Sequence, residues 1–129
     1  MSSLEFSRSA STITLLAATG ETVGQWDAAN FVDSHSDGPW PAGTYNFDHC
    51  GTHADDAPNS AYGSNGIFVF NVPNRTGMGV HSGRRDIADG AGRSGFRHCT
   101  EGCIRTTDEA TAQILATHGA DPLSTIDVG

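Results

Sequence analysis

The densest group of chemically reactive side chains lies within residues 79–107. It contains a histidine followed by a serine, His81-Ser82, and a glycine followed by a cysteine, Gly102-Cys103. A thiol attacks a carbonyl only as a thiolate, so it needs a base, and the oxyanion that forms needs hydrogen-bond donors. We expect His81 to be the base for Cys103 and the backbone N–H groups of Gly102 and Cys103 to be the donors. These residues predict cysteine-dependent acyl transfer.

The basic side chains gather in the same part of the chain. All 7 are arginines and six of them lie within residues 75–105, although the chain is acidic, with 15 acidic side chains and a formal net charge of −8. Guanidinium groups bind carboxylates through paired hydrogen bonds, so this concentration predicts a carboxylate-bearing substrate. Arg105 and Arg84 are the candidate substrate-binding residues. The overall acidity argues against a nucleic-acid partner.

Two motifs resemble the catalytic domain of the L,D-transpeptidases (the YkuD-type fold). That family has a histidine, a spacer, and then Ser/Thr-His-Gly-Cys followed by an apolar residue and often arginine; residues 100–105 here read Thr-Glu-Gly-Cys-Ile-Arg. Residues 40–45, Trp-Pro-Ala-Gly-Thr-Tyr, resemble the family's Thr-Pro-x-Gly-x-Phe turn. Glu101 stands where the family usually has a second histidine, and Cys103 lies 22 residues after His81, slightly farther than usual.

The resemblance implies a fold and a chemistry. It predicts a mainly β protein, an L,D-transpeptidase-like β-sandwich with one short helix after the catalytic cysteine, formed by residues 1–129 as a single domain. The upstream His81 is then the base, oriented by a main-chain carbonyl at Ser82 rather than by a carboxylate. No cofactor and no metal in the active site are implied.

The resemblance also implies the substrate. Cys103 would attack the L-centre carbonyl of diaminopimelate in a peptidoglycan tetrapeptide stem and expel D-alanine. An amine, a free D-amino acid or water would then resolve the thioester. These three acceptors correspond to L,D-transpeptidation, D-amino-acid exchange and L,D-carboxypeptidase activity.

The N-terminus predicts how the protein reaches its substrate. Met-Ser-Ser-Leu-Glu-Phe lacks the basic start and apolar core of a signal peptide, and no apolar run is long enough to span a membrane. We therefore expect export to the bacterial periplasm or cell envelope by a specialised secretion system. The chain most resembles the compact, signal-free L,D-transpeptidase effectors of type VI secretion, which implies an antibacterial toxin with an immunity protein and secretion machinery as partners.

Two other functions remain open. Glu101 in place of the family histidine is compatible with a catalytically inactive domain that binds peptidoglycan peptides. A zinc-binding domain is the second alternative, because two runs have tolerable spacing for a tetrahedral site. These runs are His49-Cys50-x-x-His53 and His98-Cys99-x-x-x-Cys103. In an oxidising compartment Cys50 and Cys99 could also form a disulfide and leave Cys103 free.

The expected supporting elements are mostly strands. A hydrophobic content of 36% and 16 glycines favour a loop-rich β fold. Apolar alternation, short apolar runs and β-branched residues predict strands at residues 12–18, 21–27, 44–48, 66–70 and 123–128. Trp40 and Tyr45 are expected to be scaffold, in the core or in the wall of a cleft.

One helix is expected after the cysteine. Thr106 and Glu109 form a capping box, which predicts a helix to about Thr117 with Gly119 closing it, and with Ala110, Ile114 and Leu115 facing inward. Cys103 would then precede a helix N-terminus, whose partial positive charge favours a thiolate. Residues 86–95, rich in glycine, are expected to form a flexible lid over the site.

Overall fold

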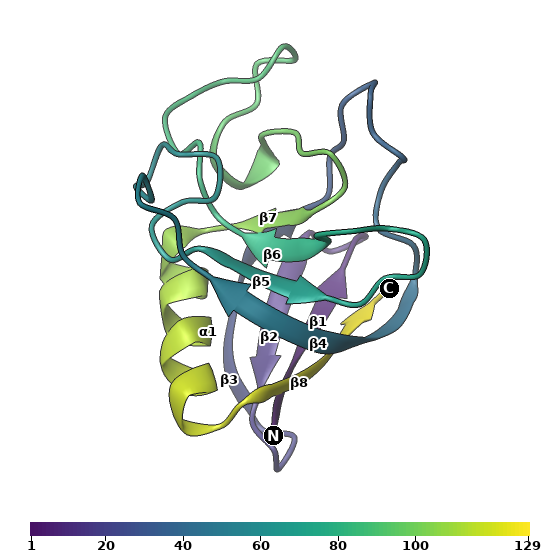
Figure 1. The fold of residues 1–129 in the computed structure, drawn as a ribbon, viewed down its shortest axis with the longest axis vertical. Helices are drawn as coiled ribbons and strands as arrows, with labels where there is room; N and C mark the ends of the chain where they lie inside the picture. The colour runs from purple at the N-terminus through teal and green to yellow at the C-terminus, as the bar shows by residue number, and fades with distance from the viewer.

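Eight strands form a closed barrel with one helix beside it (Figure 1). The computed structural model describes residues 1–129. The strands are β1 (Ser2–Ser7), β2 (Thr12–Leu16), β3 (Thr22–Ala29), β4 (Gly43–Gly51), β5 (Ile67–Phe70), β6 (Gly79–His81), β7 (Ile104–Thr106) and β8 (Leu123–Val128). The helices are α1 (Asp108–Ala120) and a 3-10 turn, η1 (Gly95–Arg97). The prediction of a mainly β protein with one short α-helix is confirmed.

The barrel has the strand order β1-β2-β3-β7-β6-β5-β4-β8. Two sheets share the strands β3 and β4. The two layers of the expected sandwich are therefore joined to each other along both edges. Most neighbours are antiparallel, whereas β1 with β8 and β6 with β7 are parallel. Figure 1 shows the long loops gathered at one end of the barrel, beyond β6 and β7. The parallel pair β6–β7 is therefore next to the part of the molecule with the most irregular backbone.

Alternating apolar side chains fill the barrel. In β1 and β2 the residues Leu4, Phe6, Ile13 and Leu15 are buried, while their neighbours in sequence face outward or are half-exposed. Trp40 is fully buried, as expected of a scaffold residue, and joins the same core. Burial of each leucine, isoleucine or phenylalanine side chain contributes roughly 1.5–3 kcal/mol of transfer free energy to folding.

The helix begins one residue later and ends three residues later than the sequence predicts. Thr107, not Thr106, is the N-cap, because its hydroxyl accepts a hydrogen bond from the Ala110 N–H at 3.2 Å. Gly119 lies inside the helix rather than closing it. Leu115 was expected to face inward but is 37% exposed, and Thr111 is buried on the inner face instead.

The expected position of Cys103 before the helix is wrong. Strand β7 lies between Cys103 and α1, because Ile104 and Arg105 pair with β6, and Arg105 and Thr106 pair with β3. The helix N-terminus therefore does not follow the cysteine directly. Its first residue, Asp108, instead bonds to Ser64 and Ser82.

No helix in the structure has the length and apolar character needed to cross a membrane.

Candidate active site

A cavity of about 820 Å³ opens at the loop-rich end of the barrel. Four of the residues predicted from the sequence line it, namely His81, Arg84, Cys103 and Arg105. Ser82 is almost fully buried behind His81. The structure thus brings together, around one cavity, side chains that come from two separate motifs.

The parallel pairing of β6 and β7 explains this convergence. In this register His81 lies opposite Arg105 and Val80 opposite Ile104. Cys103 comes directly before β7, and it lines the same cavity as His81 and Arg105. A pairing of three-residue strands thereby places the thiol and the imidazole at one edge of the barrel.

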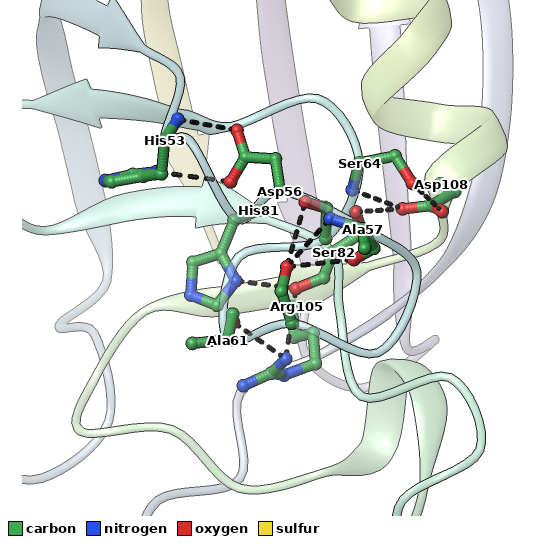
Figure 2. Close-up of polar contacts among 11 residues, drawn as sticks. His53, Asp56, Ala57, Ala61, Ser64, His81, Ser82, Arg105 and Asp108 are labelled. Atoms are coloured by element: carbon green, nitrogen blue, oxygen red, sulfur yellow. Dashed lines mark hydrogen bonds and ion pairs between the residues drawn. The ribbon is translucent and has the colours of Figure 1, made fainter.

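His81 is held in one tautomer. Its Nδ1 lies 2.8 Å from the carbonyl oxygen of Ser82 (Figure 2). A carbonyl only accepts hydrogen bonds, so Nδ1 carries the hydrogen and Nε2 carries the lone pair. Burial and the positive charge of Arg105 lower the pKa of His81 to about 3, so the imidazole is neutral at pH 7. The imidazole therefore offers its Nε2 lone pair to a proton, but a pKa of about 3 makes it a weak base in the free protein.

The Ser82 carbonyl is itself held by Arg105. Nη1 of Arg105 donates to the carbonyl oxygens of Ser82 at 3.0 Å and Ala61 at 3.1 Å. The Ser82 hydroxyl donates to the carboxylate of Asp108, which also accepts from the Ser64 hydroxyl at 2.6 Å. Figure 2 shows this network behind the His81 ring. The first residue of α1 and a buried guanidinium therefore fix the residue that orients the imidazole.

Of the six arginines in the predicted patch, Arg75, Arg84 and Arg105 line the cavity, and two of these three bond mainly to backbone carbonyls. Arg105 is only 4% exposed and its Nη atoms bond to backbone carbonyls, while its Nε has no partner. Arg75 donates to the carbonyl oxygens of residues 37, 38 and 39. Arg84 lines the cavity, is half-buried and makes one side-chain bond, to the Asn59 carbonyl. Of these three, Arg84 has the most freedom to meet a ligand.

Cys103 is a protonated thiol at neutral pH. Burial raises the pKa of the Cys103 thiol, and the charge of Glu101 raises it further, whereas a backbone bond from Gly79 and the charge of Arg105 lower it. Its Sγ donates to the Gly77 carbonyl at 3.6 Å. The pair is therefore a neutral thiol and a neutral imidazole rather than a thiolate and an imidazolium.

The backbone at Gly102 requires glycine. Its φ is +139°, and a Cβ there would lie 3.2 Å from the Met78 sulfur. The Gly102 N–H donates to the Thr100 hydroxyl at 3.1 Å. Of the two expected oxyanion donors, Gly102 is thus engaged within the loop, and the Cys103 N–H makes no hydrogen bond in the structure.

Comparison with known proteins identifies the architecture. No family model and no curated protein matches the sequence. Among solved structures, Bd1075 of Bdellovibrio bacteriovorus matches 99% of this chain with a TM-score of 0.72 at 14% identity. An L,D-transpeptidase from Xylanimonas cellulosilytica matches 99% with a TM-score of 0.62 at 13% identity. L,D-transpeptidase 1 of Mycobacterium tuberculosis matches 98% with a TM-score of 0.59 at 16% identity.

The chain has the L,D-transpeptidase fold. It spans 47%, 60% and 58% of the lengths of those three structures, so it corresponds to roughly half of each. The TM-scores show a shared fold. Because the sequence identities are low, the roles of individual residues rest on the geometry described above.

The sequence did not predict that Tyr62 and His53 lie next to His81, and His53 was considered only as a zinc ligand. Tyr62 presents its ring edge-to-face with His81, with the ring centroids 5.0 Å apart, and His53 stacks on Tyr62 at 4.6 Å. Both belong to the long polar connection between β4 and β5, which carries no periodic pattern. No sequence signal predicts these ring contacts, because they depend on how that connection folds.

The cysteines and histidines form neither the disulfide nor the zinc-ligand arrangement that the sequence allowed. All three cysteines are free, so Cys50 and Cys99 form no disulfide. The two runs considered for zinc do not form one site, because the cluster of metal-ligating side chains contains His98 and Cys99 but neither Cys103 nor any residue of the 49–53 run. None of residues 86–95, the expected lid, lines the cavity.

Proposed function

We propose that this domain catalyses cysteine-dependent acyl transfer on peptidoglycan stem peptides, with Cys103 as the nucleophile and His81 as the base. The observation that carries the proposal is the 2.8 Å contact between His81 Nδ1 and the Ser82 carbonyl. It leaves the Nε2 lone pair for a proton, and His81 shares its cavity with Cys103. The L,D-transpeptidase fold and the motif around Cys103 supply the substrate class.

In the first half-reaction the Cys103 proton moves to Nε2 of His81 as Sγ attacks the L-centre carbonyl of diaminopimelate. The free N–H of Cys103 is placed to donate to the oxyanion, with the Gly102 N–H as a second donor if it leaves Thr100. The tetrahedral intermediate collapses by breaking the C–N bond to D-alanine. His81 returns its proton to the departing amine, which leaves a thioester on Cys103.

In the second half-reaction an acceptor attacks the thioester and His81 removes its proton. The C–S bond then breaks, and the proton returns to the Cys103 sulfur. An amine acceptor gives L,D-transpeptidation, a D-amino acid gives exchange and water gives carboxypeptidase activity. Arg84 is the proposed partner for a substrate carboxylate, whereas Arg105, through Ser82, acts mainly as a positioning residue.

The resemblance to type VI secretion effectors supports a finer proposal. The domain would act in the cell envelope of a target bacterium and would be neutralised there by an immunity protein. Periplasm-directed expression in a host bacterium tests this: growth arrest by the wild type but not by Cys103→Ala is expected. Equal growth of both strains at matched protein levels contradicts the toxin role.

The reaction is tested by incubating purified tetrapeptide muropeptides with the wild type and with Cys103→Ala, followed by mass spectrometry. We expect loss of D-alanine, or its exchange, with the wild type alone. Cys50→Ser is the matched control, because Cys50 is exposed on β4 and away from the cavity, and it should retain activity. No product from folded wild type would instead favour the inactive, peptide-binding alternative.

A further inference from the structure

Three side chains with metal-ligating atoms meet beside the cavity. Asp89, His98 and Cys99 each offer one such atom, and the three atoms lie within 4.8 Å of one another. His98 and Cys99 also line the cavity wall. The cluster joins the connection after β6 to the segment just before β7, and neither His81 nor Cys103 belongs to it.

The imidazole of His98 is held by the backbone. Its Nδ1 lies 2.9 Å from the Cys99 carbonyl oxygen, so Nδ1 carries the hydrogen and Nε2 keeps the lone pair. A histidine whose second nitrogen donates to a carbonyl is the usual arrangement of a metal-binding histidine, because that bond fixes the tautomer and the ring orientation.

The carboxylate of Asp89 is fixed in the same way. Its side chain is only 2% exposed. Oδ1 accepts from the N–H groups of Ala91 and Arg93, both at 2.9 Å. Oδ2 accepts from the Cys99 N–H at 3.0 Å and from Arg93 Nε at 3.2 Å. These bonds hold the carboxylate beside the histidine and the thiol, and a metal ion would replace one of them, of which the bond from Arg93 Nε is the longest.

We propose that Asp89, His98 and Cys99 bind a divalent transition metal ion, with Zn²⁺ the best match. A carboxylate, an imidazole and a thiolate are the ligand types that zinc takes, and three protein ligands leave the fourth position for water. Binding forms an S–Zn bond at Cys99 and releases its thiol proton to solvent, with no change in oxidation state. The acyl-transfer chemistry does not use this metal.

Binding would connect a loop outside the cavity to one that lines it. Asp89 belongs to the connection between β6 and η1, whereas Cys99 lies four residues before Cys103. The Cys99 carbonyl also accepts a bond from Arg105 at 3.5 Å. The positive charge of Arg93 opposes a cation here, so we expect a site of moderate affinity rather than a very tight one.

Titration of the full chain with Zn²⁺ by calorimetry tests the proposal. The titration uses the Cys103→Ala variant, which removes the candidate nucleophile as a competing thiol. We expect one equivalent of Zn²⁺ to bind. Adding Cys99→Ser or His98→Gln in that background should weaken binding at least tenfold. Cys50→Ser in the same background is the control and should leave the affinity unchanged.

A second readout identifies the ligand. Co²⁺ bound to the Cys103→Ala variant should show thiolate-to-cobalt absorption, and Cys99→Ser should abolish it while the metal-free thermal unfolding stays unchanged. Absence of Zn²⁺ binding, or binding that survives both Cys99→Ser and His98→Gln, overturns the proposal. These results are independent of muropeptide turnover, so a failed metal site and a failed enzyme are distinguishable.

Discussion

At the scale of single residues, the buried neutral His81 makes stability depend on pH. Its pKa is lowered from 6.5 to about 3. The unfolded chain therefore takes up a proton between these values that the folded chain does not, so stability falls as the pH drops through this window. We expect His81 to account for a loss of about 2 kcal/mol in the free energy of unfolding between about pH 7 and pH 5.

Urea unfolding of the wild type and of His81→Asn at these two pH values measures this effect. The variant should lose most of the difference, whatever its stability at pH 7. His35→Asn is a suitable control because His35 is exposed and lies outside the core. An identical pH dependence in the wild type and in His81→Asn would refute the buried neutral state.

Glu101 adjusts the reactivity of the neighbouring thiol. Its negative charge raises the pKa of Cys103, although burial is the larger cause. We expect Glu101→Gln to speed alkylation of Cys103 by iodoacetamide a few-fold at neutral pH, because more thiolate is present. Glu101 is exposed, so the difference should shrink as salt is added. Peptide mapping separates Cys103 from Cys50 and Cys99, and an unchanged Cys103 rate would contradict the electrostatic argument.

The sequence predicted the candidate reactive side chains and much less of what holds them. The motif around Cys103 and the His81-Ser82 pair predicted residues that the structure brings to one cavity, because adjacent residues carry both the His81 side chain and the carbonyl that orients it. The bond from Arg105 to the Ser82 carbonyl and the bond from the Ser82 hydroxyl to Asp108 join residues more than twenty positions apart. Such bonds depend on strand register, which no local pattern encodes.

At the scale of elements, the first residue of α1 stabilises the site through hydrogen bonds. Asp108 accepts hydrogen bonds from the Ser82 hydroxyl and from the backbone and hydroxyl of Ser64. Since hydrogen bonds to a charged group contribute about 1.5–3 kcal/mol each when partly buried, we expect Asp108→Ala to lower the free energy of unfolding by about 2 kcal/mol or more.

Chemical denaturation of Asp108→Ala tests this, and Glu109→Ala is a matched control in the same helical turn. Glu109 is exposed and makes no side-chain hydrogen bond in the structure, so its replacement should cost less than about 0.5 kcal/mol. Equal effects of the two substitutions would show that Asp108 acts only through the helix dipole.

Five of the eight strands were predicted from apolar patterns, the four-residue β5 among them, whereas β1, β6 and β7 were not. The C-terminal strand was predicted at residues 123–128, the bounds that β8 has. Strand β7 has only three residues, and no strand was predicted between Cys103 and the helix. It is a strand because both its edges are paired, to β3 and to β6. Strand β1 was missed for a related reason, since its alternation rests on two large side chains, Leu4 and Phe6.

At the scale of the whole molecule, β8 closes the barrel between β1 and β4. Ile126 is fully buried at this closure and belongs to the core. We expect Ile126→Ala to lower the free energy of unfolding by about 2–5 kcal/mol, because it leaves a cavity that the paired strands cannot fill. Asp127→Ala, an exposed change on the same strand, should have little effect in the same urea titration. A small effect of Ile126→Ala would mean that the barrel closes without tight packing there.

The pairing of the first strand with the last has a consequence for synthesis on the ribosome. β1 emerges early and finds β2 beside it, but its other partner, β8, is made more than a hundred residues later. A nascent chain that has not yet reached Leu123 therefore exposes the unpaired edges of both β1 and β4. Such edges invite wrong pairings, and synthesis of β8 covers both of them at once.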